Sequence, residues 1–300
     1  MKRKILYFIN PISGPNRKKP LEYLIKEKTQ EQKIDYEILP AEKNGAYPFL
    51  KDKIKKEKFT DVVICGGDGT VNQVASALLG IDINIGIIPA GSGNGLAFTA
   101  KIPKQPSRAL DLIFSATAQY IDAFYINNYF SCMLCGIGFD AQVAHDFALD
   151  KNRGLTTYVK QSVKNFFKAS PYIFDITVNG NTFSTEAFFI SVANSNQFGN
   201  NFTIAPKASL NDGLLDIIIV KKMSKVKLLW AVLQQIKFGE VKQNGEKNFN
   251  ESEVLYFQTD KLVIHNPLLA PLHVDGDPAI TDKKLSVKIL PLAFKLLQPS

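Results

Sequence analysis

The segment Gly66–Thr70, with the sequence Gly-Gly-Asp-Gly-Thr, combines residue types that could hold a phosphate group. It follows the short apolar run Val62–Cys65 and precedes a helical pattern that starts near Val71. Glycine lets the backbone approach a ligand closely, and N–H groups at the start of a helix favour anions. Asp68 is unusual in an anion site and indicates a bound Mg²⁺ or a proton-transfer role. A tight turn in which Asp68 caps the helix is the alternative.

A second glycine-rich loop, Pro89–Gly95, follows the apolar run Ile85–Ile88. It matches neither the Walker A pattern nor G-x-G-x-x-G, so its motif alone is not diagnostic. Ser92 and Asn94 offer side-chain donors to phosphate or sugar oxygens. Two such loops at successive strand ends of one sheet would line one side of a single cleft.

A third loop with a turn composition follows the first apolar run, Ile5–Ile9. In this loop Asn10 and Ser13 offer amide and hydroxyl donors, and the basic residues Arg17–Lys19 come next. Their charge could neutralise phosphate, while a solvated charge run at the start of a helix is the alternative.

The elements that must position these loops alternate along the first third of the chain. This alternation of strands and helices is typical of βαβ units and a mostly parallel sheet, which binds ligands at the carboxyl ends of its strands. The expected strands are Ile5–Ile9, Tyr36–Leu39, Val62–Cys65 and Ile85–Ile88. The expected helices are Pro20–Lys33, Pro48–Lys58 and Gly69–Leu79.

From about residue 120 the pattern changes, because strand-like runs follow one another with turn residues between them. Such succession predicts a β-rich domain of mainly antiparallel strands. The expected strands are Tyr120–Ile126, Tyr129–Cys135, Tyr172–Val178, Thr182–Ala193 and Leu214–Val220. Helical segments are expected at Leu155–Ala169 and Lys225–Phe238. The second has apolar residues with basic flanks, which is typical of an interfacial helix, and a buried helix is its alternative.

Size and composition narrow the functional classes. The 300 residues suffice for two domains, and the net charge of +8 favours anionic partners, with scattered surface lysines as the alternative. No stretch approaches the roughly 18 apolar residues of a membrane span, so we expect a cytoplasmic protein, compatible with peripheral membrane association. Nucleic acid is not an expected partner, because no interleaved basic and aromatic motif is present.

Cys132 and Cys135 lie in one strand-like run, where core packing is expected rather than metal or redox chemistry.

The three loops together resemble the diacylglycerol kinase catalytic family, which includes bacterial lipid kinases and the sphingosine and ceramide kinases. The resemblance covers nearly the whole chain in the right order. The matching segments are Asn10-Pro-x-Ser-Gly14, Gly66–Thr70, Pro89-x-Gly-Ser-Gly-Asn94, Gly136-Ile-Gly-Phe-Asp140-Ala, Pro206-x-Ala208 with Asp212-Gly-x-Leu-Asp216, and Asp275-Gly-Asp277.

The resemblance implies an α/β N-terminal domain with a mostly parallel sheet, like that of NAD kinases and diacylglycerol kinases, plus a β-rich, mainly antiparallel C-terminal domain. The expected nucleotide-binding domain comprises residues 1–122 plus 285–300, because the last strand, about Leu285–Leu290, is expected to return to it. Residues 123–284 would form the lipid-substrate domain.

The resemblance also implies the site residues. Nucleotide binding falls to residues of the three loops: Asn10, Ser13, Arg17, Gly66, Gly67, Asp68, Gly69, Thr70, Gly91, Ser92, Gly93 and Asn94. ATP would be the phosphate donor, and Asp68 would hold Mg²⁺ directly or through water. Asp277 would be the general base that accepts the lipid hydroxyl proton. Asp140 would contact the lipid head, with capping of the following helix as the alternative.

A second cation, Mg²⁺ or Ca²⁺, is implied at a structural loop that includes Asp212 and Asp216. Backbone carbonyls of Ser209, Asp212 and Leu214 would complete its ligand set. A plain turn over Asn211–Gly213 is the alternative.

The implied activity is a lipid kinase that transfers the ATP γ-phosphate to the hydroxyl of a diacylglycerol or sphingoid-base lipid. Its partners would be ATP and lipid at a membrane surface, and a homodimer is compatible with the sequence. Gly95, Gln73 and Asp277 depart from residues common in the family, since Gly95 supplies no magnesium ligand and Asp277 replaces a longer Glu. A nucleotide- or lipid-binding protein with little turnover is therefore one alternative. An NAD kinase, which shares Gly-Gly-Asp-Gly-Thr, is another.

Overall fold

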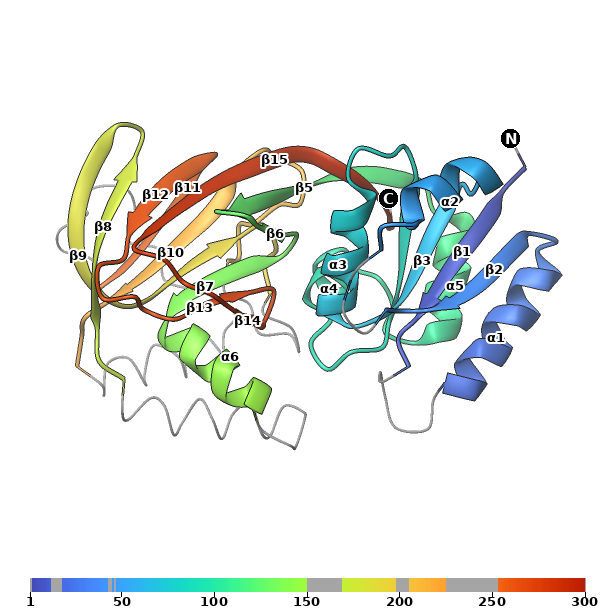
Figure 1. Ribbon diagram of the computed structural model, residues 1–300, viewed down its shortest axis with the longest axis horizontal. Coiled ribbons are helices and arrows are strands. Elements are labelled where there is room, and N and C mark those ends of the chain that lie inside the picture. Colours follow the sequence, from blue (N-terminus) through green and yellow to red (C-terminus); the bar gives the residue numbers. More distant parts are fainter. Residues whose placement is uncertain are drawn as a thin grey trace. The chain divides into compact units, whose positions relative to one another are not determined.

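The computed structural model describes residues 2–11, 18–42, 45, 47–149, 169–197, 205–224 and 253–299. The chain divides into two compact units, Met1–Asp122 with Leu292–Ser300, and Ala123–Pro291 (Figure 1). In unit 1 the elements are β1 (Lys4–Ile9), α1 (Lys18–Glu31), β2 (Asp35–Pro40), α2 (Leu50–Glu57), β3 (Asp61–Gly66), α3 (Asp68–Leu78), β4 (Asn84–Pro89), α4 (Gly95–Thr99) and α5 (Pro106–Ser115).

The strand β5 (Ala118–Ile126) leads from unit 1 into unit 2. The later elements are β6 (Tyr129–Ser131), β7 (Leu134–Gly138), α6 (Phe139–Leu149), β8 (Tyr172–Val178), β9 (Asn181–Ala193), β10 (Leu215–Lys221), β11 (Val254–Thr259), β12 (Lys261–His265), β13 (Leu272–Val274), β14 (Asp277–Ala279) and β15 (Lys284–Leu297).

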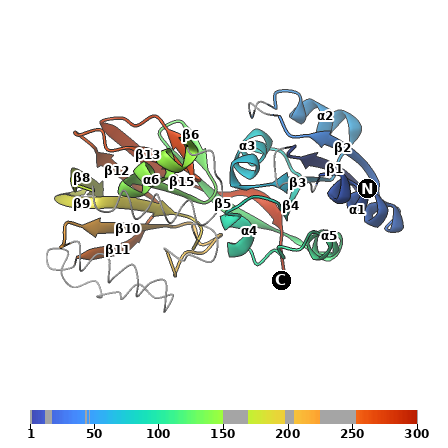
Figure 2. The same cartoon turned by 90° about the horizontal axis from the view of Figure 1, so that it is seen from below.

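The core of unit 1 is a parallel sheet in the order β4-β3-β1-β2. Its central strands are buried on both faces, which explains why they appear in the sequence as continuous apolar runs. Figure 2 shows α2 and α3 on one face of this sheet and α1 and α5 on the other. The α/β fold expected from the alternating pattern is confirmed, and every strand and helix expected there is present within two residues. Helix α5 was not predicted.

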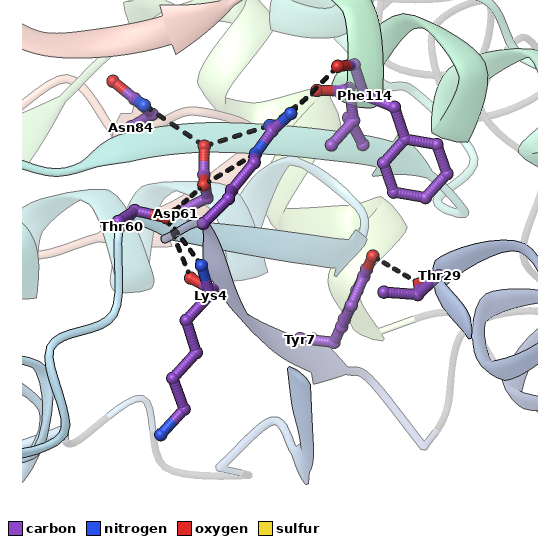
Figure 3. A network of polar contacts seen from close by, with 9 residues as sticks. Lys4, Tyr7, Thr29, Thr60, Asp61, Asn84 and Phe114 are labelled. Atoms are coloured by element: carbon purple, nitrogen blue, oxygen red, sulfur yellow. Dashed lines mark hydrogen bonds and ion pairs between the residues drawn. The ribbon is translucent and has the colours of Figure 1, made fainter. Parts of the chain in front are cut away.

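A buried network fixes the edge of the unit 1 sheet at which β1, β3 and β4 begin (Figure 3). Arg3 donates through Nε and one terminal nitrogen to the carboxylate of Asp61 at 3.0 and 3.1 Å, and its guanidinium also reaches the carbonyls of Ile113–Phe114. Thr60 and Asn84 complete the partners of Asp61, which is 1% exposed. Because both carboxylate oxygens of Asp61 accept hydrogen bonds, the ion pair of Arg3 and Asp61 holds these strands in register. The glycine loops lie at the opposite ends of the strands.

Unit 2 is a mainly antiparallel sheet, as expected. Along it the strands follow the order β14-β13-β7-β9-β8-β12, and β12 also pairs with β15. The strands β10 and β11 extend the sheet from β9. One face is packed by a large apolar cluster that includes Ile137, Phe174 and Ile217.

The strand expected over Tyr129–Cys135 is wrong as a single element, because it breaks into β6 and β7. The backbone N–H groups of Cys132–Leu134 donate to the carboxylate of Asp275 instead of continuing a ladder. All three cysteines are buried, and burial raises the pKa of the Cys135 thiol, which keeps it protonated and suited to packing.

The last strand, β15, contributes to both units, because its residues from Leu292 onward belong to unit 1 and its earlier residues to unit 2. β15 pairs with β12 over Lys284–Lys288, and its later part, Lys295–Leu296, runs parallel to β4. The alternation of buried and exposed residues from Lys284 to Ile289 places its apolar side chains in the core of unit 2. Leu292 has a φ of +50°, and its N–H donates to the buried carboxylate of Asp122 at 2.7 Å.

No helix within the described residues is long and apolar enough to cross a membrane. The expected helix Lys225–Phe238, and all but the last residue of Leu155–Ala169, lie outside those residues.

Candidate active site

The two glycine-rich loops of unit 1 touch through their backbones. A Cβ added at Gly91 would lie 2.4 Å from the Cα of Gly67, and one added at Gly67 would lie 3.0 Å from the Cα of Gly91. The Ala90 N–H also donates to the Gly66 carbonyl at 2.9 Å. Only residues without side chains allow this approach, so the glycines bring both loops to one place at the strand ends.

Asp68 is the first residue of α3 rather than its cap. The cap residue is Gly67, which has no side chain to bond the helix, so the expected alternative of a capping Asp68 is wrong. The helix ladder begins with the Val71 N–H, which donates to the Gly67 carbonyl at 3.1 Å. The positive end of the helix dipole therefore faces a half-buried carboxylate, which is the favourable arrangement for a negative charge.

The loop after β1 is joined to the same place. The Asn10 side-chain amide donates to the Thr70 hydroxyl at 2.8 Å, and the Asn10 N–H donates to the Cys65 carbonyl at 2.9 Å. Ser13 and Arg17 lie outside the described residues.

Asn94 shapes its own loop. Its backbone has a φ of +59°, and its side-chain amide both accepts from the Gly91 N–H at 2.9 Å and donates to the Gly91 carbonyl at 2.8 Å. The neighbouring Ser92 is exposed. Gln73, which stands where the resembled family often has Glu, lies against the backbone of Gly45.

In unit 2 a tight hairpin presents Asp277. The two residues between β13 and β14, Asp275 and Gly276, have φ values of +50° and +87°, which is the pattern of a type I′ turn. Asp277 is exposed and pairs with Val274 across this turn.

Asp275 clamps that hairpin onto the preceding strands. Its carboxylate is 7% exposed and accepts from the Ser131 hydroxyl at 2.5 Å and from the N–H groups of Cys132, Met133 and Leu134 at 3.0–3.2 Å. A carboxylate with this many donors has a fixed orientation. Sequence reasoning missed this role, although the Asp-Gly dipeptide already indicated the turn.

Replacing Asp275 with alanine is expected to lower the free energy of unfolding by about 3–5 kcal/mol, because several buried donors lose their charged acceptor. Urea unfolding followed by circular dichroism measures this change. Asp260→Ala, at an exposed aspartate of the same unit, is the control and should change stability by less than about 0.5 kcal/mol. A loss below about 1 kcal/mol for Asp275→Ala would show that the clamp is unimportant.

The family-like segment around Asp140 lies beside the hairpin, because β7 pairs with β13 and aligns Gly136 with His273. Asp140 is in the first turn of α6, where Oδ1 accepts from the Ala141 N–H at 2.8 Å. Its Oδ2 lies 3.5 Å from His273 Nε2 and makes no hydrogen bond within the described part of the chain. A Cβ at Gly136 would lie 2.0 Å from that Oδ2 and 2.4 Å from Nε2, so the glycine creates the space for both groups.

The His273 ring connects Asp140 to the turn. The Gly276 N–H donates to His273 Nδ1 at 3.3 Å. In the neutral ring this bond assigns the proton to Nε2, the nitrogen that faces Asp140.

In the loop proposed to hold a structural cation, side chains form hydrogen bonds to other groups of the same loop. Asp212 Oδ1 accepts from the Leu214 N–H at 3.0 Å, and the Ser209 hydroxyl donates to the Asn211 side chain at 3.2 Å. Asp216 is buried in β10 and accepts from Tyr256 and Gln258, and burial raises its pKa. Across the described ranges, no three His, Cys, Asp or Glu side chains gather to form a metal site.

Comparison with known proteins matches both halves of the chain. The diacylglycerol kinase catalytic domain model matches residues 4–126, and the YegS C-terminal NAD kinase beta sandwich-like domain model matches residues 134–298. A Yersinia pestis (strain Pestoides F) protein named "Probable lipid kinase YegS-like" is 30% identical over 247 residues, covering 79% of this chain and 78% of the relative. The "Diacylglycerol kinase" of Bacillus subtilis (strain 168) is 25% identical over 225 residues, covering 73% of this chain and 72% of the relative.

A crystal structure of a diacylglycerol kinase from Bacillus anthracis str. Sterne has the same fold, with a TM-score of 0.71 at 19% sequence identity over 99% of this chain and 97% of that one. The second family model alone matches more than half of the 300 residues. The chain carries both family models one after the other and is 30% identical to a YegS-like relative over 79% of its length, and it therefore belongs to the YegS-like lipid kinases of the diacylglycerol kinase family.

Proposed function

We propose that this chain transfers the γ-phosphoryl group of ATP to the hydroxyl of a diacylglycerol or sphingoid-base lipid. The observation that carries the proposal is the backbone contact of the two glycine loops, Gly67 against Gly91, directly before the helix that begins at Asp68. A phosphate chain needs close backbone approach and a helix start, and both are present at this point in unit 1.

The residues of unit 1 fit a nucleotide with its magnesium ion. The backbone of Gly66–Thr70 and of Gly91–Gly93 would hold the phosphates, with Asn10 bracing the first loop through Thr70. Asp68 would hold Mg²⁺, since a half-buried carboxylate beside a phosphate cradle is the donor that this hard cation prefers. When bound, the ion neutralises negative charge on the phosphate oxygens. Ser13 and Arg17 belong to the same proposal from sequence alone.

In unit 2 the proposed acceptor residues are Asp277 and Asp140. The lipid hydroxyl oxygen forms a bond to the γ-phosphorus, the bond from phosphorus to the β–γ bridging oxygen breaks, and the hydroxyl proton passes to Asp277 directly or through one water. Asp140, in the first turn of α6 beside the hairpin, is the proposed contact of the lipid head. The loop with Ser209, Asp212 and Leu214 remains proposed as a structural cation site.

The test is product identification by mass spectrometry after incubation with ATP, Mg²⁺ and separate diacylglycerol, sphingosine, ceramide and NAD samples. We expect phosphorylation of a diacylglycerol or a sphingoid base, and none of NAD. Phosphorylation of NAD alone, or of no acceptor while ATP still binds, would contradict the proposal.

Gly91→Ala is expected to weaken ATP binding at least tenfold, because the new Cβ would meet the Gly67 backbone at 2.4 Å and separate the two loops. Neither atom can move away by changing a rotamer. Isothermal titration calorimetry measures the affinity, and Ser115→Ala, at an exposed serine of α5 outside both glycine loops, is the control. An unchanged affinity in Gly91→Ala would show that the loop contact does not form the nucleotide site.

Two replacements of His273 separate its two contacts. His273→Asn can still accept from the Gly276 N–H, whereas His273→Gln can still donate toward Asp140. If the ring positions the turn before Asp277, kcat should fall about tenfold in the glutamine variant and much less in the asparagine variant, with KM for ATP unchanged in both. The reverse order in steady-state kinetics would assign the role to the Asp140 contact.

A further inference from the structure

Unit 2 exposes a compact group of large apolar side chains beside the acceptor hairpin. Leu268, Leu269 and Ile280 are 57%, 49% and 82% exposed. The two leucines lie in the loop between β12 and β13, and Ile280 follows the last residue of β14. Large apolar side chains gathered at one exposed place are typical of a surface that binds something apolar. We call these three residues the apolar tip.

A buried asparagine holds the two loops of the apolar tip side by side. The Asn266 side-chain amide donates to the carbonyl of Ala270 at 3.1 Å, to the hydroxyl of Thr281 at 3.0 Å and to the carbonyl of Asp282 at 3.3 Å. Its Oδ1 accepts from the Ala270 N–H at 2.8 Å, and its own N–H donates to the Lys283 carbonyl at 2.8 Å. The loop of the leucines is therefore joined to the loop of Ile280 by bonds that leave little freedom.

The leucine loop is also stiff in itself. Pro267 and Pro271 stand on either side of it, and the Leu269 N–H donates to the Asn266 carbonyl at 3.0 Å. Leu269 has a φ of +52°, a conformation that non-glycine residues rarely adopt. Because the backbone that carries this exposed side chain is already ordered, binding through it would cost little conformational entropy.

Basic side chains lie next to the apolar tip. Lys283 and Lys284 are exposed, and Lys284 pairs across the sheet with the exposed His265. The acidic neighbours are Asp282, whose Oδ1 accepts from the Lys283 N–H, the exposed Asp277 at the start of β14, and Asp175, which pairs with His265 from β8. An apolar projection with basic flanks is the arrangement that binds an anionic bilayer surface.

We propose that the apolar tip inserts Leu268, Leu269 and Ile280 into the surface of an anionic lipid bilayer. The proposal deepens the proposed function and rests on it, because a lipid acceptor resides in a bilayer. Ile280 stands three residues after Asp277 on the same strand path, which is about 10 Å of extended chain. Insertion of the apolar tip would therefore bring the proposed general base close to the head-group layer.

The test compares binding of the intact protein to vesicles of phosphatidylglycerol and phosphatidylcholine. The variant Leu268→Ser with Ile280→Ser removes two apolar groups and leaves the backbone of Leu269 untouched. Its matched control is Ile173→Ser with Tyr23→Ser, at two other exposed apolar residues. We expect vesicle co-sedimentation to be at least tenfold weaker for the tip variant and unchanged for the control. Lys283→Gln with Lys284→Gln should weaken binding only at low salt, where the charges are not screened.

Turnover separates this proposal from the proposed function. The tip variant should phosphorylate a monomeric short-chain acceptor at the wild-type rate, and a vesicle-embedded acceptor at least tenfold more slowly. Vesicle binding by the tip variant within twofold of wild type overturns the apolar tip as a membrane contact, whatever the turnover. A wild-type dimer that becomes monomeric in the tip variant, with vesicle binding unchanged, would assign the surface to self-association and also overturn it. Absence of turnover with both acceptors in the wild type would contradict the proposed function, while co-sedimentation would still decide the role of the tip.

Discussion

Asp68→Ala is expected to reduce lipid phosphorylation by about 10³-fold while the protein stays folded. The carboxylate stands at the start of α3, beside the contact of the two glycine loops, where it would hold Mg²⁺ against the phosphates. Removing one preorganised charged group from a reacting centre typically costs about 10²–10³ in kcat, and loss of the ion adds to this. Steady-state turnover with radiolabelled ATP measures the effect, and circular dichroism checks the fold.

The chain supplies a matched control for this experiment. Asp52 also lies in the first turn of a helix of unit 1, where it interacts with the dipole of α2, but it is exposed. Asp52→Ala should keep wild-type turnover and lose about 0.5 kcal/mol of stability at most. Wild-type turnover in Asp68→Ala would reject the assigned role, and equal losses in both variants would point to helix stability instead.

Asp277→Asn is expected to lower kcat by about 10²–10⁴ without changing the affinity for ATP. The amide keeps the shape of the side chain but cannot take the proton from the acceptor hydroxyl. The type I′ turn and the Asp275 clamp remain in place, so the hairpin should still present residue 277 in the same position. Single-turnover kinetics measure the chemical step, and calorimetry measures ATP binding.

Two further variants sharpen the assignment of the base. Asp277→Glu should retain or raise turnover, since it restores the longer carboxylate that the resembled family has at this position. Asp282→Asn, at an exposed aspartate shortly after β14, should have no effect. Normal turnover in Asp277→Asn would mean that another group accepts the proton.

Much of unit 1 was predictable because its signals are local. Continuous apolar runs identify the buried parallel strands, and the glycine-rich segments that follow Val62–Cys65 and Ile85–Ile88 identify the loops at their carboxyl ends. The missed helix α5 begins at Pro106, a proline at the first helical position that could have signalled it. The strand β15 is longer than the predicted Leu285–Leu290, although polar and apolar residues alternate in the sequence from Lys284 to Ile289.

The sequence by itself therefore determined the α/β and β-rich fold classes, the family and the residue types at the phosphate loops. Only the tertiary structure decided that Asn94 closes its own loop, that Asp275 holds Ser131–Leu134, and that His273 faces Asp140. The Ser131–Asp275 bond joins residues 144 positions apart. The residues next to Asp275 in the sequence do not reveal which distant residues will contact its side chain. The packing of β13 against β7 supplies that partner, and this packing depends on the whole sheet rather than on any one segment.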